Sequence, residues 1–396
     1  MSPRAVFSFA LVALVGCQFA NDPTESALGA PEVSLDVSAM PARWIGEHNL
    51  FKDVRRQIPN DGLVPYDLNT PHFADYATLH RFVWVPPETS IRFDEDEALR
   101  YPNGSVIVLT VGYRDDLNEA HSDEHIVETR LIVRRNDMWE SFQYIWNAEM
   151  TDAELSLHGG DVDVAWVDYE SAPRSMTYHV PNRNQCKMCH RIEGEFQPLG
   201  PVNAAYLNRD YVYSEGSENQ LEHWQRIGIL EPLSLPPEDF ERIPQWDDPA
   251  SGTLDQRARA YLDMNCSSCH RPGGLGFTSG LDLRYAQNDP VKFGVYKAPV
   301  AAGRGVGSAR FGIVPGEPEN SILIHRLRST DPGIRMPAVG RGLVHADGLA
   351  LIESWIREMD YPDLAENQRA ADQAKVARQS WSAPETFVQV SEGSTL

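Results

Sequence analysis

Cysteine is scarce in this sequence, which has only five among 396 residues. They are Cys17, Cys186, Cys189, Cys266 and Cys269. Four of them form two close pairs and the fifth stands near the N-terminus, so no pair is left over for a structural disulfide. The folded chain must therefore be stabilised by packing and by whatever the two close pairs bind.

Positive charge is also scarce. Lys and Arg number 35 against 57 Asp and Glu, which gives a formal net charge of −22. Nucleic acids need a basic protein surface because their phosphates are anionic, so this composition argues against a nucleic-acid partner. It favours solubility and, through long-range attraction, redox partner proteins with a basic docking surface. Motifs for flavin, nicotinamide or nucleotide binding are missing too, which argues against a self-contained dehydrogenase.

Long apolar runs are absent beyond the N-terminus, where Arg4 precedes an apolar stretch over residues 5–15. That stretch is too short to span a bilayer as a mature helix, and it leads through Leu-Val-Gly to Cys17. The pattern resembles the lipobox of bacterial lipoproteins, in which cleavage leaves the cysteine as a lipidated N-terminus. An ordinary secretory signal, cleaved a little later, is the alternative.

The lipobox predicts a signal peptide over residues 1–16 and a lipid anchor at Cys17. Small and polar residues over 17–40 predict a flexible tether with a reach of roughly 25–30 Å. Several acyl chains would anchor the protein stably to a membrane. Gln18 occupies the position that sorts lipoproteins between the two membranes, and it favours the outer one. We therefore expect a lipid-anchored protein in the periplasm of a cell with Gram-negative-type export.

Both close pairs belong to a Cys-x-x-Cys-His motif, at residues 186–190 and 266–270. This spacing is that of covalent c-type haem attachment, since one helical turn brings two thiols to the two vinyl groups of one haem edge. The next residue then places its imidazole under the iron, so His190 and His270 are predicted proximal ligands. Four thiols would form the thioether bonds: Cys186, Cys189, Cys266 and Cys269. A zinc site shared by both pairs is the alternative, but it leaves both histidines unexplained.

The distal ligands are harder to assign from the sequence. Met336 lies in a Pro-bounded loop and is the predicted ligand of the second haem, because a thioether opposite an imidazole suits electron transfer and raises the potential. Its rivals are Met264, too close to the attachment site, and His325, expected on the exposed side of its helix. For the first haem the candidate is His223, in a stretch of helical character. The alternatives are His179, Met176, His158 or an open iron.

The hydrophobic pattern predicts an α+β multidomain protein. Residues 41–180 carry β-branched and aromatic residues in alternation, separated by turn signals such as Asn136-Asp137, and predict an antiparallel β domain of the sandwich type. Two mainly α-helical cytochrome c-like haem domains are expected to follow, over residues 181–240 and 241–365. In the second, Thr253 and Gln256 form a capping box ahead of the motif helix. Residues 366–396 form a polar tail.

Several short stretches spread over the chain identify it as resembling one family, the bacterial two-haem c-type cytochromes with an N-terminal β domain. These stretches are Pro-Tyr-Asp-Leu-Asn-Thr-Pro at 65–71, Asp-Tyr at 75–76, Glu-Thr-Arg-Leu at 128–131, Asn-Gln-Cys at 184–186, Leu-Asn at 207–208, Asn-Gln-Leu at 219–221, Arg-Ala-Arg-Ala-Tyr-Leu at 257–262, Asn-Cys at 265–266 and Arg-Met-Pro at 335–337. Members usually carry a Lys-Thr pair where this chain has Leu109-Thr110, so any role of that lysine is missing here. The resemblance implies electron transfer in the periplasm or at the cell surface.

The favoured function is therefore that of a membrane-tethered two-haem c-type cytochrome that carries electrons from the first haem to the second. Two other functions stay open. The first is a haem enzyme of the peroxidase kind, or a cytochrome subunit of a dehydrogenase, with the first haem as the reactive site. The second is a binding module, in which the β domain recognises a surface partner or glycan.

Overall fold

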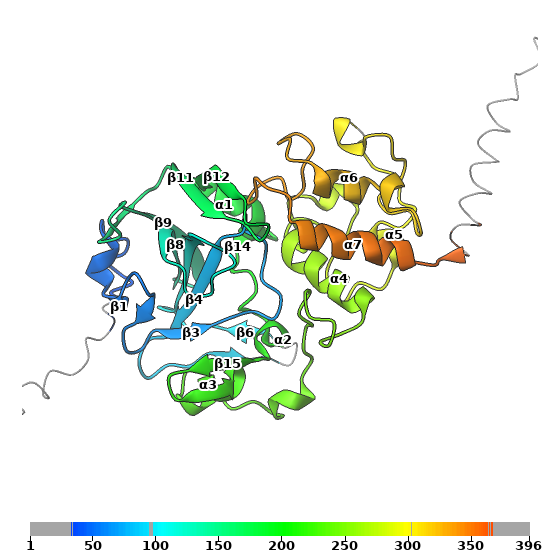
Figure 1. Ribbon diagram of the computed structural model, residues 1–396. Coiled ribbons are helices and arrows are strands. Elements are labelled where there is room, and N and C mark those ends of the chain that lie inside the picture. The colour runs from blue at the N-terminus through cyan, green and yellow to red at the C-terminus, as the bar shows by residue number, and fades with distance from the viewer. Residues whose placement is uncertain are drawn as a thin grey trace, which may run out of the picture.

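The computed structural model describes residue 33, residues 35–94, 98–301 and 303–362, and residues 364 and 366. The predicted signal peptide, the lipid anchor at Cys17, most of the tether and nearly all of the polar tail lie outside these residues. In the described part, no helix is long and apolar enough to cross a membrane. Figure 1 shows the β elements gathered at one side of the molecule and α4 to α7 at the other.

A six-stranded antiparallel sheet forms the centre of the β side (Figure 1). In spatial order its strands are β10 (Ala153–Leu155), β9 (Met138–Trp146), β8 (Glu124–Arg135), β7 (Val106–Arg114), β4 (Thr78–Trp84) and β3 (Val64–Tyr66). The turn between β8 and β9 is the predicted Asn136-Asp137, and both residues adopt a positive φ, as the tightest hairpin turns require. The prediction of antiparallel strands in this region is confirmed.

Smaller elements surround the sheet. The remaining strands pair in twos: β1 (Phe51–Asp53) with β2 (Ile58–Pro59), β5 (Arg92–Phe93) with β6 (Leu99–Arg100), β11 (Gly160–Val167) with β12 (Pro173–Val180), β13 (Arg191–Ile192) with β14 (Glu195–Phe196), and β15 (Asp210–Tyr213) with β16 (Gly216–Asn219). The α-helices are α1 (Arg183–His190), α2 (Ala204–Leu207), α3 (Gln220–Arg226), α4 (Leu254–Leu262), α5 (Pro290–Phe293), α6 (Ile322–Arg328) and α7 (Ala346–Glu358). Single turns complete the set: η1 (Ile45–His48), η2 (Pro237–Asp239), the π-turn η3 (Asp263–Ser267), η4 (Phe277–Ser279), η5 (Arg304–Val306) and η6 (Pro318–Asn320).

The two faces of the sheet differ because side chains alternate along each strand. One face is mainly apolar and packs against the segment that contains Met40, Ile45 and Leu50. The other face carries an apolar cluster at each end and polar residues between them. Cross-strand register places three polar residues and one leucine in a line across the middle of this face. We call this line the arginine row: Arg81, Leu109, Arg130 and Gln143.

Two different layers cover the ends of this second face. At one end, α2, α3 and the β15–β16 hairpin bury Leu207, Leu221 and Trp224 against Val83 and Ile132 of the sheet. At the other end, the β11–β12 hairpin buries a second cluster around Trp166 and Tyr178. Figure 1 shows α2, α3 and β15 at one end of the sheet and β11 and β12 at the opposite end. Helix α1 covers the middle of the face, which carries the arginine row.

The predicted fold class is wrong, because the chain does not form two mainly α-helical cytochrome c-like domains. After β12, the helices α1, α2 and α3 span only 8, 4 and 7 residues and alternate with the hairpins β13–β14 and β15–β16. Helices this short cannot enclose a core of their own. They instead share one core with the sheet, in which Trp224 lies beside Tyr66 at a ring-centroid distance of 5.8 Å.

The C-terminal part departs from the predicted class in another way. Its helices α4, α5, α6 and α7 have 9, 4, 7 and 13 residues, and loops make up most of the chain between them. A Thr253–Gln256 capping box begins α4, as predicted. Helix α7 packs on α4 so closely that a Cβ at Gly348 would lie 2.4 Å from the Tyr261 hydroxyl oxygen, which requires glycine. Loops, and not helices, therefore supply most of the surroundings of the second motif.

Replacing Trp224 by alanine tests the shared core. The side chain is fully buried between α3 and the sheet, so Trp224→Ala should lower the free energy of unfolding by about 3–5 kcal/mol. Guanidinium denaturation followed by circular dichroism measures this change, and the strand signal should be lost in the same transition. As a control, Val212→Ala, at a side chain that is 78% exposed, should change stability by less than about 0.5 kcal/mol. Equal effects of the two substitutions would contradict a shared core.

Candidate functional site

The two Cys-x-x-Cys-His motifs, 80 residues apart in sequence, lie in direct contact. The Cys269 thiol approaches the Met188 carbonyl oxygen at 3.3 Å and also hydrogen-bonds to the Cys189 thiol. That bond raises the pKa of Cys189 and lowers the pKa of Cys269. The four motif thiols are all free of disulfide bonds. The structure therefore leaves each motif cysteine available for a thioether bond.

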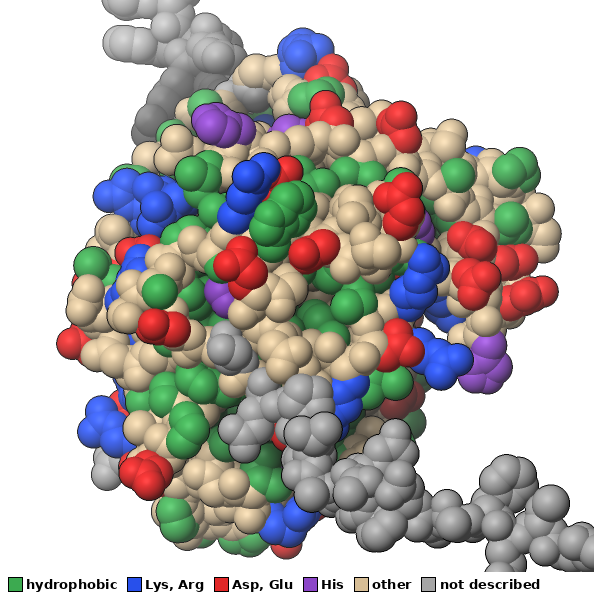
Figure 2. Space-filling view, turned by 90° about the vertical axis from the view of Figure 1, so that its left-hand side faces the viewer, with side chains coloured by type: hydrophobic (Ala, Val, Ile, Leu, Met, Phe, Trp, Pro, Cys, Tyr) green, Lys and Arg blue, Asp and Glu red, His purple; other side chains and the backbone are tan. Residues whose placement is uncertain are grey.

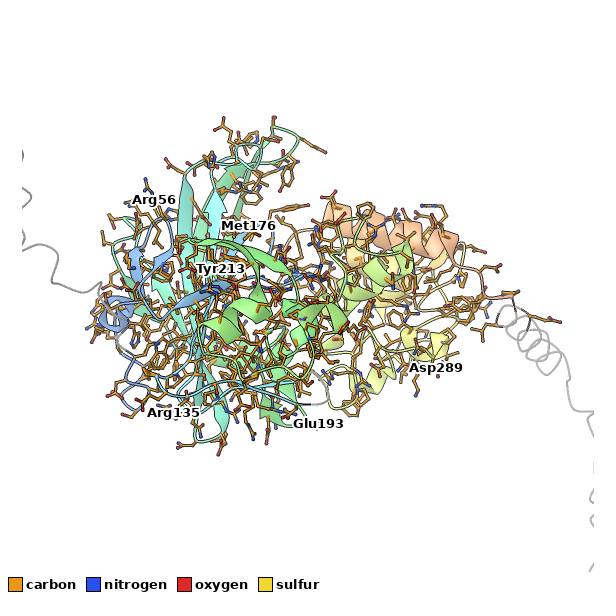
Figure 3. The ribbon with its side chains drawn as sticks, turned by 90° about the horizontal axis from the view of Figure 1, so that it is seen from below. Arg56, Arg135, Met176, Glu193, Tyr213 and Asp289 are labelled. Atoms are coloured by element: carbon orange, nitrogen blue, oxygen red, sulfur yellow. The ribbon has the colours of Figure 1, made fainter. Side chains whose placement is uncertain are left out.

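A second contact joins the segments that follow the motifs. The Glu193 amide, in the β13–β14 turn, donates to the Gly273 carbonyl at 3.2 Å. A Cβ at Gly273 would lie 2.7 Å from Glu193 Cγ, so the approach depends on glycine, whose φ of 77° is also positive. Figure 3 labels Glu193 at the boundary between the β side and the C-terminal part.

The first motif occupies the short helix α1, which begins at a capping box. Asn182 accepts hydrogen bonds from the Gln185 amide, and the Gln185 side chain returns one to Asn182. One turn of helix then sets Cys186 and His190 on the same face. Gln143 Nε2, from the arginine row, lies 3.3 Å from the Cys186 sulfur. This contact seats α1 over the polar middle of the sheet.

His190 is oriented as a metal-binding histidine is expected to be. Its Nδ1 donates to the Gln197 carbonyl at 2.8 Å, and its ring stacks on Phe196 with a centroid distance of 4.8 Å. The proton on Nδ1 leaves the lone pair on Nε2, which has no hydrogen-bond partner among the described residues. Burial lowers the pKa of His190 to about 4, so the imidazole is neutral at physiological pH and able to ligate.

His270 of the second motif has the same arrangement. The Ser279 hydroxyl donates to the Gly276 carbonyl at 2.7 Å, so it acts as acceptor for His270 Nδ1, which lies 3.1 Å away. A Cβ at Gly276 would lie 3.0 Å from the imidazole, so glycine makes room for the ring. Burial lowers the pKa of His270 as well. Its Nε2 also lacks a hydrogen-bond partner within the described ranges.

Met336 lies in a loop held by two charged side chains. Arg341, which is 6% exposed, donates from Nε to the Met336 carbonyl at 3.0 Å and from its other nitrogens to four more carbonyls. Asp75, from the β side, accepts from the Gly342 amide at 2.6 Å and the Leu343 amide at 2.8 Å. The Met336 amide donates to the carbonyl of Arg326, whose guanidinium contributes to the lowered pKa of His270. Met336 and His270 therefore border the same residue.

The two rivals of Met336 differ in the structure. Met264 packs against the core shared by the sheet and α3, so its side chain is committed to packing. His325, expected on the exposed side of its helix, is half-buried, and its Nε2 is buried without a partner among the described residues. Its ring lies against Gly307, where a Cβ would come within 3.0 Å of it.

Two of the histidines proposed from sequence for the first haem, His223 and His179, have other partners, and His158 is exposed. His223 bonds through Nδ1 to Glu218 at 2.9 Å and stacks on Tyr213 at a centroid distance of 3.4 Å. His179 pairs with Asp161 at 2.7 Å and is exposed. Within the described part of the chain, no hydrogen bond or ring contact joins His223 to α1. The assignment of His223 as a ligand stays a prediction, and the structure adds nothing in its favour.

A buried ion pair lies beneath the first motif. Arg130 of the arginine row binds Glu128 through two hydrogen bonds, of 2.6 and 2.9 Å. Tyr178 adds a 2.7 Å hydrogen bond to the same carboxylate, whose side chain is fully buried. The positive charge of Arg130 acts to lower the pKa of both Cys186 and His190. The Arg130 guanidinium thus lies close to the first motif, and the Glu128 carboxylate balances its charge.

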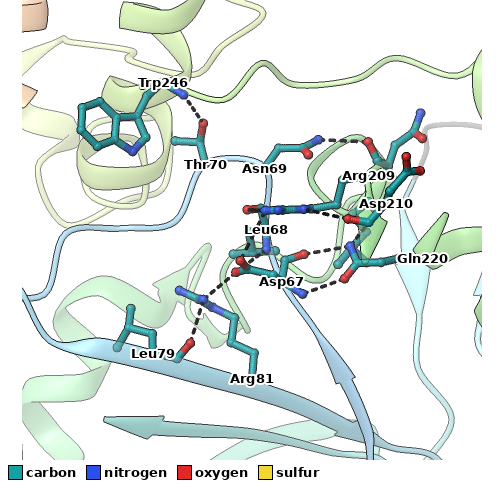
Figure 4. A network of polar contacts seen from close by, with 12 residues as sticks. Asp67, Leu68, Asn69, Thr70, Leu79, Arg81, Arg209, Asp210, Gln220 and Trp246 are labelled. Atoms are coloured by element: carbon teal, nitrogen blue, oxygen red, sulfur yellow. Dashed lines mark hydrogen bonds and ion pairs between the residues drawn. The ribbon is translucent and has the colours of Figure 1, made fainter. Parts of the chain in front are cut away.

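The segment from Asp67 to Phe73 connects the sheet to both motifs, and Figure 4 shows most of its polar contacts. Asp67 receives Arg81 Nη1 at 2.8 Å, and its amide donates to Gln220 of α3 at 2.7 Å. Farther along, the Thr70 hydroxyl donates to the Pro244 carbonyl at 2.6 Å. The Phe73 amide donates at 2.9 Å to the side chain of the residue that precedes Cys266. Residues 67–71 of this segment belong to one of the stretches on which the family resemblance rests.

A cavity of about 960 Å³ opens between this segment, the sheet and helices α4 and α7. Its lining includes His72, His345 and three arginines, Arg81, Arg114 and Arg257. Each arginine has one buried nitrogen without a hydrogen-bond partner among the described residues. Such donors fit the carboxylates of an anionic ligand, and haem carries two propionates. The volume lies near the upper end of the range for small-molecule sites, so a bulky cofactor edge fits it.

The donor set thus fits haem at both motifs: free thiols in pairs, and an imidazole at each motif with Nδ1 already bonded. The cavity adds three arginines, each with one nitrogen that lacks a partner among the described residues. Sequence reasoning missed His72 and the three arginines, because none belongs to a recognisable motif. Although Cys189 and Cys269 meet, no group of three or more His, Cys, Asp or Glu side chains is placed to hold a metal ion in the part that the structure describes.

Comparisons with family models, with curated proteins and with solved structures found no match for this chain. The family resemblance therefore stays a prediction that rests on the short stretches quoted above.

Removing Arg130 tests the buried ion pair. Arg130→Met leaves Glu128 buried and unpaired, so the free energy of unfolding should fall by about 3–5 kcal/mol. Adding Glu128→Gln should restore much of this loss, because no buried charge then remains. Urea denaturation of the single and double variants measures both changes, with Arg174→Gln as control at a half-exposed arginine that pairs with Asp168. A double variant no more stable than Arg130→Met would contradict this account.

Proposed function

We propose that this chain is a two-haem c-type cytochrome that transfers electrons. The observation that carries the proposal is the contact between two Cys-x-x-Cys-His motifs whose histidines each have Nδ1 bonded to a protein oxygen and Nε2 free. When bound, haem c supplies an iron that accepts and releases one electron. Four cysteines would hold the two groups covalently: Cys186, Cys189, Cys266 and Cys269. His190 and His270 would be the proximal ligands.

The protein groups around each motif support this role. The Gln197 carbonyl and the Ser279 hydroxyl select the tautomer of His190 and His270 and fix the plane of each ring. The thiol contact and the Glu193–Gly273 hydrogen bond hold the two attachment sites side by side. Electron tunnelling slows steeply with distance, so adjacent sites favour rapid transfer between them.

Met336 would set the direction of transfer. A thioether ligand raises the potential of a haem above that of a haem with two nitrogen ligands or an open iron. Electrons would then pass from the first motif to the second. The clamp on its loop by Arg341 and Asp75 supports a fixed position for Met336.

The location follows from the N-terminal pattern alone. A lipid anchor at Cys17 would tether the protein in the periplasm, at the outer membrane, where redox proteins with a basic docking surface would be its partners. On the face shown in Figure 2, acidic and basic side chains are interspersed. Attraction of a basic partner would therefore rest on the net charge of the whole chain more than on a patch of this face.

One observation favours a second candidate function. The large cavity beside Arg81 and His345 offers room for a substrate near the first motif. An iron open on that side would suit a haem enzyme of the peroxidase kind, or the cytochrome subunit of a dehydrogenase. The reduced protein distinguishes the two functions, because an open iron binds carbon monoxide and a six-coordinate electron carrier does not.

Counting haem in thiol variants tests the main proposal. Produced with the c-type maturation machinery, the wild-type chain should carry two covalent haems by mass and by pyridine haemochrome absorbance. The double variants Cys186→Ser/Cys189→Ser and Cys266→Ser/Cys269→Ser should each carry one. Cys17→Ser, the matched control, should keep two haems but leave the membrane fraction. A wild-type chain with bound zinc and no haem would overturn the proposal.

Replacing Met336 tests its role as a ligand. Met336→His should keep the second haem six-coordinate and lower its potential by on the order of 0.1 V, because nitrogen replaces sulfur within the range of roughly 0.8 V that axial ligands span. A spectroelectrochemical titration measures the shift. Met138→Leu, at an exposed methionine of β9, should leave both potentials unchanged. If His325→Ala alone shifts the second potential and Met336→His does not, His325 is the ligand instead.

A further inference from the structure

His72 is a half-buried histidine whose ring has no hydrogen-bond partner. It stands between β3 and β4 and lines the large cavity. Among the described residues, no hydrogen bond reaches either of its ring nitrogens. Several other histidines with restricted exposure are paired, such as His48 with Tyr144, His345 with Tyr261 and His223 with Glu218, whereas His325, like His72, has a ring nitrogen without a partner among the described residues.

Three charged neighbours locate His72 relative to the first motif. Burial is the main cause that lowers its pKa to about 3, and the positive charges of Arg81, Arg130 and His190 contribute to the same value. Arg81 and Arg130 stand in the arginine row with only Leu109 between them, on the sheet face that α1 covers. His72 therefore lies on the same face as His190, approaching from the β3–β4 side while His190 comes from α1.

The backbone around His72 is fixed on both sides. Before it, Thr70 donates to the Pro244 carbonyl and accepts from the Trp246 amide at 3.2 Å. After it, the Phe73 amide binds the Asn265 side chain, whose own amide group donates to the Tyr261 carbonyl at 2.9 Å. The Phe73 ring also stacks on His345 at a centroid distance of 4.2 Å. This segment therefore holds His72 at a set distance from both motifs.

We infer that His72 is the distal ligand of the iron bound at the first motif, opposite His190. The inference rests on the proposed function, and it names a residue that no sequence motif indicates. A neutral imidazole ring with both nitrogens unpaired is a ready nitrogen ligand. Two imidazoles at the first site and an imidazole with a thioether at the second would place the two potentials in the order that the proposed direction of transfer needs.

Spectroscopy of the two-haem protein tests the inference. The wild-type protein should be fully low-spin when oxidised, and after reduction it should bind no carbon monoxide. His72→Ala should convert one haem of two to high-spin and bind one carbon monoxide per chain, and added imidazole should restore the low-spin spectrum. His223→Ala, the matched control, should bind none. His72→Met should stay six-coordinate and raise the potential of one haem, which provides a second test if the alanine variant folds poorly.

Three results would overturn the inference. They are a wild-type protein that binds carbon monoxide at the first motif, a His72→Ala protein that stays low-spin with two haems, and carbon monoxide binding that appears with His223→Ala in place of His72→Ala. In the second and third cases both haems are still counted and the wild-type protein stays six-coordinate, so the proposed function stands and only the ligand assignment fails. Carbon monoxide binding by the wild-type protein would also favour the haem enzyme over the electron carrier. A chain that carries no haem would overturn the proposed function itself.

Discussion

Two arginines in the middle of a buried sheet face impose the main constraint on this structure. A guanidinium removed from water is costly unless it is paired, so each requires partners from other parts of the chain. Arg130 obtains Glu128 and Tyr178, which binds the β11–β12 hairpin to the sheet. Arg81 obtains Asp67, which fixes the start of the segment that leads to His72. Apolar layers cover the two ends of the face, and the first motif covers its polar centre. The residues that pair with the two arginines therefore help to position the site.

The contact between the two motifs follows from the way the chain crosses this face. After α1 the chain leaves to build the layer of α2 and α3, and it returns through α4 to place Cys269 beside the first motif. The hydrogen bond between Phe73 and Asn265 and the contacts of Asp75 with the 342–343 backbone tie the returning part to the β side. One polypeptide segment, from Asp67 to Tyr76, therefore sets the geometry of both sites. This explains in physical terms why the segment buries three polar residues, Asn69, Thr70 and Asp75.

Leu109 illustrates how a local departure changes the site. It stands in the arginine row, between Arg81 and Arg130, where members of the family that the chain resembles usually have lysine. A third cation at this position would add to the charge that two arginines already place there. With leucine, the centre of the row is apolar and offers no ligand from the sheet floor. If the first motif binds haem, as proposed, its distal ligand would come from another element, and the proposal assigns His72 to this role.

The sequence by itself determined which residue types the two Cys-x-x-Cys-His motifs carry and the local structure around them. The spacing of Cys186, Cys189 and His190 depends on a single helical turn. The Thr253–Gln256 capping box depends on four consecutive residues, and the Asn136-Asp137 turn depends on two neighbouring residues. Tertiary structure alone decided the meeting of Cys189 with Cys269, the shared core around Trp224 and the place of His72 near His190. Short-range patterns report hydrogen bonds within a turn or two. Contacts between residues tens to hundreds of positions apart depend on how layers pack, and no local pattern records that.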